Sequence, residues 1–221
     1  MQIELYKAMD CANFAHNFIY QCAPVIAGVK VSNLLGVKTE LAAAAAAAAR
    51  ISGLESFDLC ESECRCWGCK KSMILIYSEK KLLKQLFKHE NNEFLNTRGI
   101  LSYNEYIESK FLYVKPSVKG YLHYVLSEIS RRYHSYEDGK AEFPHEIGVI
   151  LGYPLEDVKG YMENGGRKCL LNGYWKVYNN PEEAKRKFEI YDEVTESLMK
   201  SLLSDGCSFK SILTRHFDRA A

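Results

Sequence analysis

The sequence has neither an excess of one charge nor a long apolar run. Its 221 residues include 29 Lys and Arg against 28 Asp and Glu, so no global field would draw the protein to nucleic acid or to an anionic membrane. No stretch approaches the ~18 apolar residues of a spanning helix, and the start, MQIELYKAMD, lacks the order of a signal peptide. We therefore expect a cytoplasmic protein whose partners include neither membranes nor nucleic acids.

The sequence also lacks the common enzyme signatures. It contains no Gly-rich phosphate loop, no nucleophile elbow and no recognisable Cys-His pairing, which leaves out the usual nucleotide-binding and hydrolase motifs. His145-Glu146 resembles the start of a zinc-protease motif, but that motif needs a second His one helical turn later, and residue 149 is Val. A peptidase of this type is excluded.

Apolar spacing predicts helices mixed with a few short strands. A first helix is expected to end near Gln21, because Pro24 interrupts its pattern. Further helices are expected near residues 41–53, 79–89, 116–135, 145–152, 155–164 and 180–203. Strands are expected near Val25–Val31, Met73–Tyr77 and Tyr174–Tyr178. This order predicts an α+β fold, a single domain over residues 1–221 with a small sheet covered by helices.

An unbroken alanine tract, Ala42–Ala49, interrupts the otherwise varied sequence. Alanine is the best helix former, so the tract predicts a helix that ends near Gly53. A natural globular helix has an apolar and a polar face, and eight identical residues have neither. The tract is typical of engineering or of placeholder residues, and no function is argued from it.

Two blocks carry a family resemblance. One is CAPVIAGVKVSNLLGV at residues 22–37, and the other comprises FPHEIG, LGYP, EDV and GYWKVY between residues 143 and 178. With these motifs the chain resembles the bacterial domain-of-unknown-function 3793 family, found mainly among anaerobic Firmicutes. The resemblance spans residues 22–191 except for a poorly matching stretch, 39–71, which we interpret as a variable insertion with the alanine tract and a Cys-rich loop. It implies an accessory role in iron or redox metabolism, with a flavodoxin-like or iron-handling protein as partner.

The Cys-rich loop reads CESECRCWGC and contains Cys60, Cys64, Cys66 and Cys69. Thiolates at such spacing can share a zinc ion or an iron-sulfur cluster, because a short loop can turn several sulfurs toward one centre. The order departs from the paired C-x2-C knuckles of zinc ribbons, so the identity of a metal stays open. Reduced cysteines within an insertion are the alternative.

Polar and aromatic residues in both family-like blocks predict a pocket between them. The ten candidates for cofactor binding are Cys22, Lys30, Asn33, His145, Glu146, Tyr153, Asp157, Trp175, Lys176 and Tyr178. The aromatic residues could stack on flavin or haem, or form core packing, and the lysines could bind an anion or lie on an exposed face.

Three functions follow from these residues. The first is a cytosolic accessory protein that binds a cofactor, metal or protein partner. The alternatives are an oxidoreductase or transferase that uses the same pocket, and a structural or interaction protein. Whether the protein is an enzyme is left open at this point.

Overall fold

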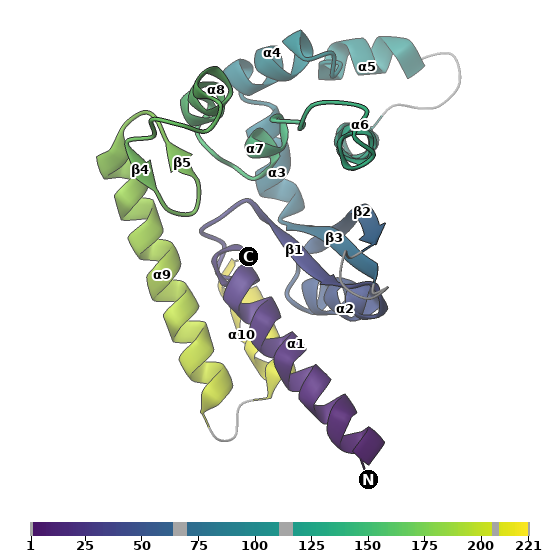
Figure 1. Cartoon of the computed structure of the whole chain (residues 1–221), viewed down its shortest axis with the longest axis vertical. Helices are drawn as coiled ribbons and strands as arrows, with labels where there is room; N and C mark the ends of the chain where they lie inside the picture. Colours follow the sequence, from purple (N-terminus) through teal and green to yellow (C-terminus); the bar gives the residue numbers. More distant parts are fainter. Residues whose placement is uncertain (1, 64–69, 111–116, 205–207, 221) are drawn as a thin grey trace.

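The fold is organised around a short apolar strand, β3 (Lys70–Tyr77). β3 pairs antiparallel with β1 (Ser32–Lys38) and β2 (Glu55–Glu63), which gives the sheet order β1-β3-β2. Helices cover both faces of this sheet (Figure 1). The computed structural model describes residues 2–63, 70–110, 117–204 and 208–220. The expected α+β class, a single domain with a small helix-covered sheet, is confirmed, as is the strand at Met73–Tyr77.

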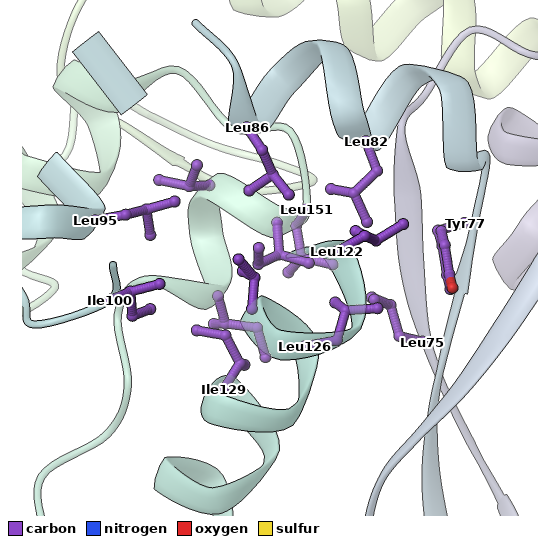
Figure 2. Packing of buried hydrophobic residues seen from close by; sticks show 14 of the residues in the cluster. Leu75, Tyr77, Leu82, Leu86, Leu95, Ile100, Leu122, Leu126, Ile129 and Leu151 are labelled. Atoms are coloured by element: carbon purple, nitrogen blue, oxygen red, sulfur yellow. The ribbon is translucent and has the colours of Figure 1, made fainter. Parts of the chain in front are cut away.

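One face of the sheet packs on a large cluster of leucine and isoleucine side chains, shown in Figure 2. Leu75 and Tyr77 of β3 point into this cluster. The surrounding helices are α3 (Glu79–Leu86), α4 (His89–Thr97), α5 (Tyr103–Lys110), α6 (Val118–Glu137) and α7 (Ile147–Ile150). The apolar stripe of α6 lies here, with Tyr121, Leu122, Val125, Leu126 and Ile129 buried.

The other face of the sheet packs on a second cluster, into which β3 contributes Ile74 and Ile76. This cluster is covered by α1 (Gln2–Ile26), α2 (Ala42–Ile51), α9 (Pro181–Leu203) and α10 (Phe209–Ala220), with η1 (Thr39–Leu41) leading into α2. The alanine tract therefore forms the predicted helix, and three of its alanines are buried. Because both faces of β3 are covered, the strand is apolar throughout Met73–Tyr77 rather than alternating.

The end of the first helix and the first strand were predicted wrongly. α1 continues through Pro24, and the segment Val25–Val31 is helix and turn, with β1 beginning only at Ser32. An internal proline removes one helical hydrogen bond and costs roughly 3 kcal/mol. Residues 22–26 are all buried, and this burial offsets the cost of the proline.

A small hairpin follows the two short helices of the second family-like block. α8 (Leu155–Asn164) ends at a glycine pair, with Gly165 at φ 56° and Gly166 at φ 73°. β4 (Leu171–Asn172) and β5 (Lys176–Val177) then form an antiparallel two-stranded ladder. The strand predicted over Tyr174–Tyr178 is thus reduced to two residues.

This hairpin is held between α8 and α9. Trp175 and Val177 pack on Ala184, Phe188 and Tyr191 of α9 and form a third core cluster. On the other side, the Tyr178 side chain lies close to Gly160 of α8. A Cβ added to Gly160 would be 2.5 Å from the Cβ of Tyr178. The glycine in the middle of α8 is therefore required for packing.

Gly160→Ala is expected to destabilise the protein by about 1 kcal/mol, although alanine is the better helix former by a similar amount. The added methyl group would force Tyr178 away from α8. Urea denaturation followed by circular dichroism would measure the change. Lys159→Ala, at an exposed neighbouring position of α8, is the matched control and should leave stability nearly unchanged. A Gly160→Ala protein more stable than wild type would contradict this packing argument.

Candidate functional site

The structure brings the two family-like blocks into direct contact. The Ser32 hydroxyl donates a 2.8 Å hydrogen bond to the carbonyl oxygen of Ile150, which joins the start of β1 to α7. Gly152, at φ 77°, lies against Val31 so closely that a Cβ there would be 2.9 Å from a Val31 methyl group. The turn after α1 is therefore packed on the corner between α7 and α8.

A pocket of about 400 Å³ opens beside this contact, between the α7–α8 corner and the hairpin. Its aromatic walls are Phe143, Tyr153, Tyr161, Tyr174 and Trp175. Its polar lining includes His145, Asp157 and Lys176, and Leu34 of β1 also reaches it. Of the ten predicted cofactor residues, five line this pocket: His145, Tyr153, Asp157, Trp175 and Lys176.

The aromatic walls are fixed by contacts with each other. The Tyr153 and Trp175 rings stack with centroids 5.2 Å apart, and the Tyr153 hydroxyl donates to the carbonyl oxygen of Tyr174 at 3.3 Å. His145 lies between the rings of Phe143 and Tyr161, each 5.4 Å from it. Rings held in this way present flat, apolar surfaces without losing further side-chain freedom on binding.

Asp157 supports the pocket rather than presenting a free carboxylate. It is buried, and its Oδ2 accepts a 2.7 Å hydrogen bond from the Trp175 indole. Its Oδ1 accepts from the backbone N–H groups of Tyr178 and Asn179 at 2.7 and 2.9 Å. Three donors thus tie the hairpin to the first turn of α8 through one carboxylate.

His145 and Glu146 turn in different directions. The His145 ring lines the aromatic pocket, and burial lowers the pKa of its imidazole, which favours the neutral form. Glu146 is 1% exposed, and its Oε1 accepts from Arg98 and Arg132, both at 2.9 Å. Its Oε2 has no hydrogen-bond partner among the described residues. His145 and Asp157 therefore line the same pocket, whereas Glu146 is paired with two arginines outside it.

Lys30 is buried behind the pocket and is not part of its lining. Its Nζ donates to the Asn33 side chain at 2.6 Å and lies 5.8 and 5.9 Å from the ring centroids of Tyr153 and Tyr174. No carboxylate among the described residues pairs with it. Burial lowers the pKa of Lys30 to about 8, and burial raises the pKa of the nearby Cys22 thiol to about 12.

The two remaining predicted residues of the hairpin have different environments. Lys176 donates from Nζ to the carbonyl oxygen of Gly166 at 2.6 Å and lies 5.9 Å from the Tyr161 ring centroid, within the pocket wall. Tyr178 lies outside the pocket lining, packed on Gly160. Its hydroxyl is buried without a partner among the described residues.

Only one cysteine of the predicted metal loop can be placed. Cys60 lies in β2, where it is a buried, free thiol, and burial together with the Glu137 carboxylate raises its pKa to about 11. Cys64, Cys66 and Cys69 lie outside the described residues. Within residues 2–63, 70–110, 117–204 and 208–220 no group of His, Cys, Asp and Glu is arranged to hold a metal. A thiol with a raised pKa must lose its proton before it can bind a metal.

Of the five aromatic walls, Phe143, Tyr161 and Tyr174 were not among the ten sequence candidates. Phe143 opens the FPHEIG motif, and Tyr161 is an aromatic residue on an otherwise polar face of α8. An exposed aromatic side chain on an amphipathic helix is the signal that could have pointed to Tyr161.

The described helices include none long and apolar enough to cross a membrane.

Comparison with known proteins places the chain in a family. The family described as Protein of unknown function (DUF3793) matches residues 18–213, so the chain belongs to it. The match includes both blocks that form the pocket and also the segment 39–71. No curated protein and no solved structure gives a significant match.

Proposed function

We propose that this protein is an accessory binding protein that holds a small, flat, mainly apolar cofactor in the aromatic pocket. The observation that supports this proposal is the pocket itself: five aromatic side chains from α8, the hairpin and the adjoining loops enclose a space of about 400 Å³. Known ligand pockets have volumes of roughly 300–1,000 Å³ and are mostly apolar with a few polar groups. The polar side chains of the lining are His145, Asp157, Asn172 and Lys176, of which Asp157 is already bonded to the Trp175 indole and the hairpin backbone.

The size of the pocket favours some cofactors over others. At the low end of the usual range, it suits a single fused ring system such as that of flavin better than the larger macrocycle of haem. The Lys176 ammonium group at the rim would attract a ligand with an anionic or electron-rich edge. A flavin-like ring is therefore the cofactor class that we propose.

The setting in iron or redox metabolism, with a flavodoxin-like or iron-handling partner, remains part of this proposal. A reducing cytoplasm agrees with the free thiols of Cys22, Cys60 and Cys169. A zinc or iron-sulfur centre at the cysteine motif stays a separate proposal, because three of its four thiols lie outside the described residues. Elemental analysis of wild type against a Cys66→Ser, Cys69→Ser double mutant tests it: equal metal in both, or none in either, rejects the site.

An oxidoreductase or transferase is the second candidate, and one observation favours it. An amine with a pKa near 8, such as that of Lys30, is partly neutral near neutral pH and can act as a nucleophile or base. Lys30 nevertheless does not line the pocket; its Nζ lies 5.8 and 5.9 Å from the ring centroids of Tyr153 and Tyr174, which do. This arrangement favours a binding protein over an enzyme that uses Lys30.

Trp175 offers a direct test of cofactor binding. The sequence has two tryptophans, so Trp67→Phe leaves Trp175, in the pocket wall, as the one fluorescent indole. We expect riboflavin to quench this fluorescence saturably in the single-tryptophan protein. Tyr161→Ala should weaken riboflavin binding about threefold to tenfold, because one aromatic contact contributes about 0.5–1.5 kcal/mol. Phe87→Ala, an exposed aromatic residue outside the pocket, is the control.

The native cofactor can be sought in parallel. Protein purified without oxygen should carry a flavin absorption spectrum or release a flat small molecule on denaturation. A colourless protein that releases no small molecule, and whose Trp175 fluorescence responds to neither riboflavin nor haemin, would reject the proposal. A structural or interaction protein would then be the better description.

A further inference from the structure

A second pocket lies on the other side of the FPHEIG segment and is lined by three arginines. Arg98 follows the end of α4, and Arg131 and Arg132 are neighbours in α6. All three line a space of about 400 Å³ together with Ser135 and Phe143. The arginines come from helices that are distant in sequence, so the pocket exists only in the folded chain.

A buried acid, Glu146, and a partly buried one, Glu128, hold these guanidinium groups in place. Glu146 accepts from the Arg98 Nε and the Arg132 Nη1, both at 2.9 Å, through a single oxygen. Glu128, 17% exposed, accepts from Arg131 at 2.9 and 2.6 Å and from the Arg132 Nε at 2.8 Å. The guanidinium groups are therefore ordered before any ligand arrives, which lowers the entropic cost of binding.

Three carboxylates balance the three arginines: Glu128 and Glu146 are paired with them, and Glu142, which forms no ion pair with the described residues, is exposed at the pocket. The site would therefore attract an anion through its free guanidinium donors rather than through a net charge. The terminal nitrogens of Arg98 donate to no group in the part of the chain that the structure describes. They remain available to a ligand.

We propose that this pocket binds the phosphoryl group of a small phosphorylated molecule. A guanidinium group can donate two parallel hydrogen bonds to the oxygens of a phosphate group. Both terminal nitrogens of Arg98 are free for this among the described residues, and Arg131 and Arg132 each keep one terminal nitrogen, Nη1 and Nη2 respectively, that is not bonded to either paired glutamate. The space is larger than inorganic phosphate needs, which leaves room for an organic part beside Phe143 and Ala141. The proposal is independent of the aromatic pocket and of its cofactor.

Calorimetric titration of the full-length protein with inorganic phosphate at low ionic strength tests this site. We expect saturable binding of phosphate, with sulfate similar and chloride undetectable. Arg131→Gln should weaken phosphate binding at least about tenfold, because hydrogen bonds to charged groups contribute about 1.5–3 kcal/mol. Arg131→Lys should give an intermediate loss, since it keeps the charge without the fork. Arg131 is 65% exposed, so neither change should unfold the protein.

The matched control is Arg186→Gln, which removes the same charge from an exposed position of α9. It should leave phosphate affinity unchanged, and circular dichroism should show native helix content in every variant. Phosphate binding no tighter than chloride, or an equal loss in the Arg131→Gln and Arg186→Gln proteins, would overturn the proposal. Acetate bound as tightly as phosphate would overturn the phosphoryl assignment. Riboflavin binding at the aromatic pocket should be the same in the Arg131→Gln protein, which separates the two sites.

Discussion

Asp157→Ala is expected to lower the free energy of unfolding by about 3–5 kcal/mol. The buried carboxylate accepts hydrogen bonds from the Trp175 indole and from the backbone of Tyr178 and Asn179. Alanine would leave three donors unpaired, and each buried unpaired donor costs about 1–3 kcal/mol. Because these bonds join the hairpin to α8, the aromatic pocket should be lost as well. Urea denaturation, followed by circular dichroism and tryptophan fluorescence, measures both effects.

The neighbouring acid provides the control. Glu156 occupies the same first turn of α8 but is exposed, so Glu156→Ala should cost at most about 1 kcal/mol through the helix dipole. Asp157→Asn keeps one carbonyl oxygen as an acceptor and should fall between the two alanine variants. If Asp157→Ala were no more destabilising than Glu156→Ala, the carboxylate would not be what joins the hairpin to α8.

The elements that could be predicted from the sequence are those encoded locally. The apolar run of β3, the stripe of α6 and the glycine pair after α8 each depend on a few consecutive residues. β2 was missed because a bulge between Asp58 and Cys60 shifts its pairing with β3 and disturbs the alternation of inward and outward side chains. The continuation of α1 through Pro24 was missed because burial, a tertiary effect, outweighs a local rule.

The candidate sites also contain residues that the local sequence indicates and residues that only tertiary packing brings together. The second family-like block, which supplies every lining residue of the aromatic pocket except Leu34, was identified because its polar and aromatic residues are unusual within a short segment. The candidates of the first block, Cys22, Lys30 and Asn33, do not line the pocket. The arginine pocket could not be foreseen, because Arg98 lies 48 residues from Glu146 and reaches it only through the packing of α4 on α6 and α7. Arg131 and Arg132 alone had the pattern of an exposed helix face.

Lys30→Met is expected to raise the free energy of unfolding at pH 7 by about 2 kcal/mol. Burial lowers the pKa of Lys30 from 10.5 to about 8, which corresponds to a cost of about 3 kcal/mol for keeping the ammonium charged inside the fold. Methionine fills a similar volume without a charge. The variant loses the hydrogen bond to Asn33 and the contacts with two tyrosine rings, which together offset about 1 kcal/mol of the gain.

The pH dependence of the free energy of unfolding shows whether the buried charge of Lys30 causes this stability difference. Between pH 8 and 10.5 the folded state releases the Lys30 proton while the unfolded state keeps it, so the stability of the wild type rises with pH through this window. Cys22 opposes this trend above pH 9, because its pKa of about 12 in the fold keeps it protonated when the unfolded thiol ionises. Cys22 and Lys30 interact electrostatically, so the comparison is made with Cys22→Ala in both proteins, which isolates Lys30.

The stability difference between the two proteins should therefore be largest below pH 8 and shrink toward pH 10.5, as measured by urea denaturation at each pH. A charged group that destabilises the fold and has no carboxylate partner among the described residues is typical of a functional position, because structural lysines are usually paired or exposed. If Lys30→Met instead destabilised the protein equally at every pH, the tyrosine rings and Asn33 would stabilise the ammonium fully. Lys30 would then have a structural role, and the second candidate function, an enzyme that uses this amine, would lose its support.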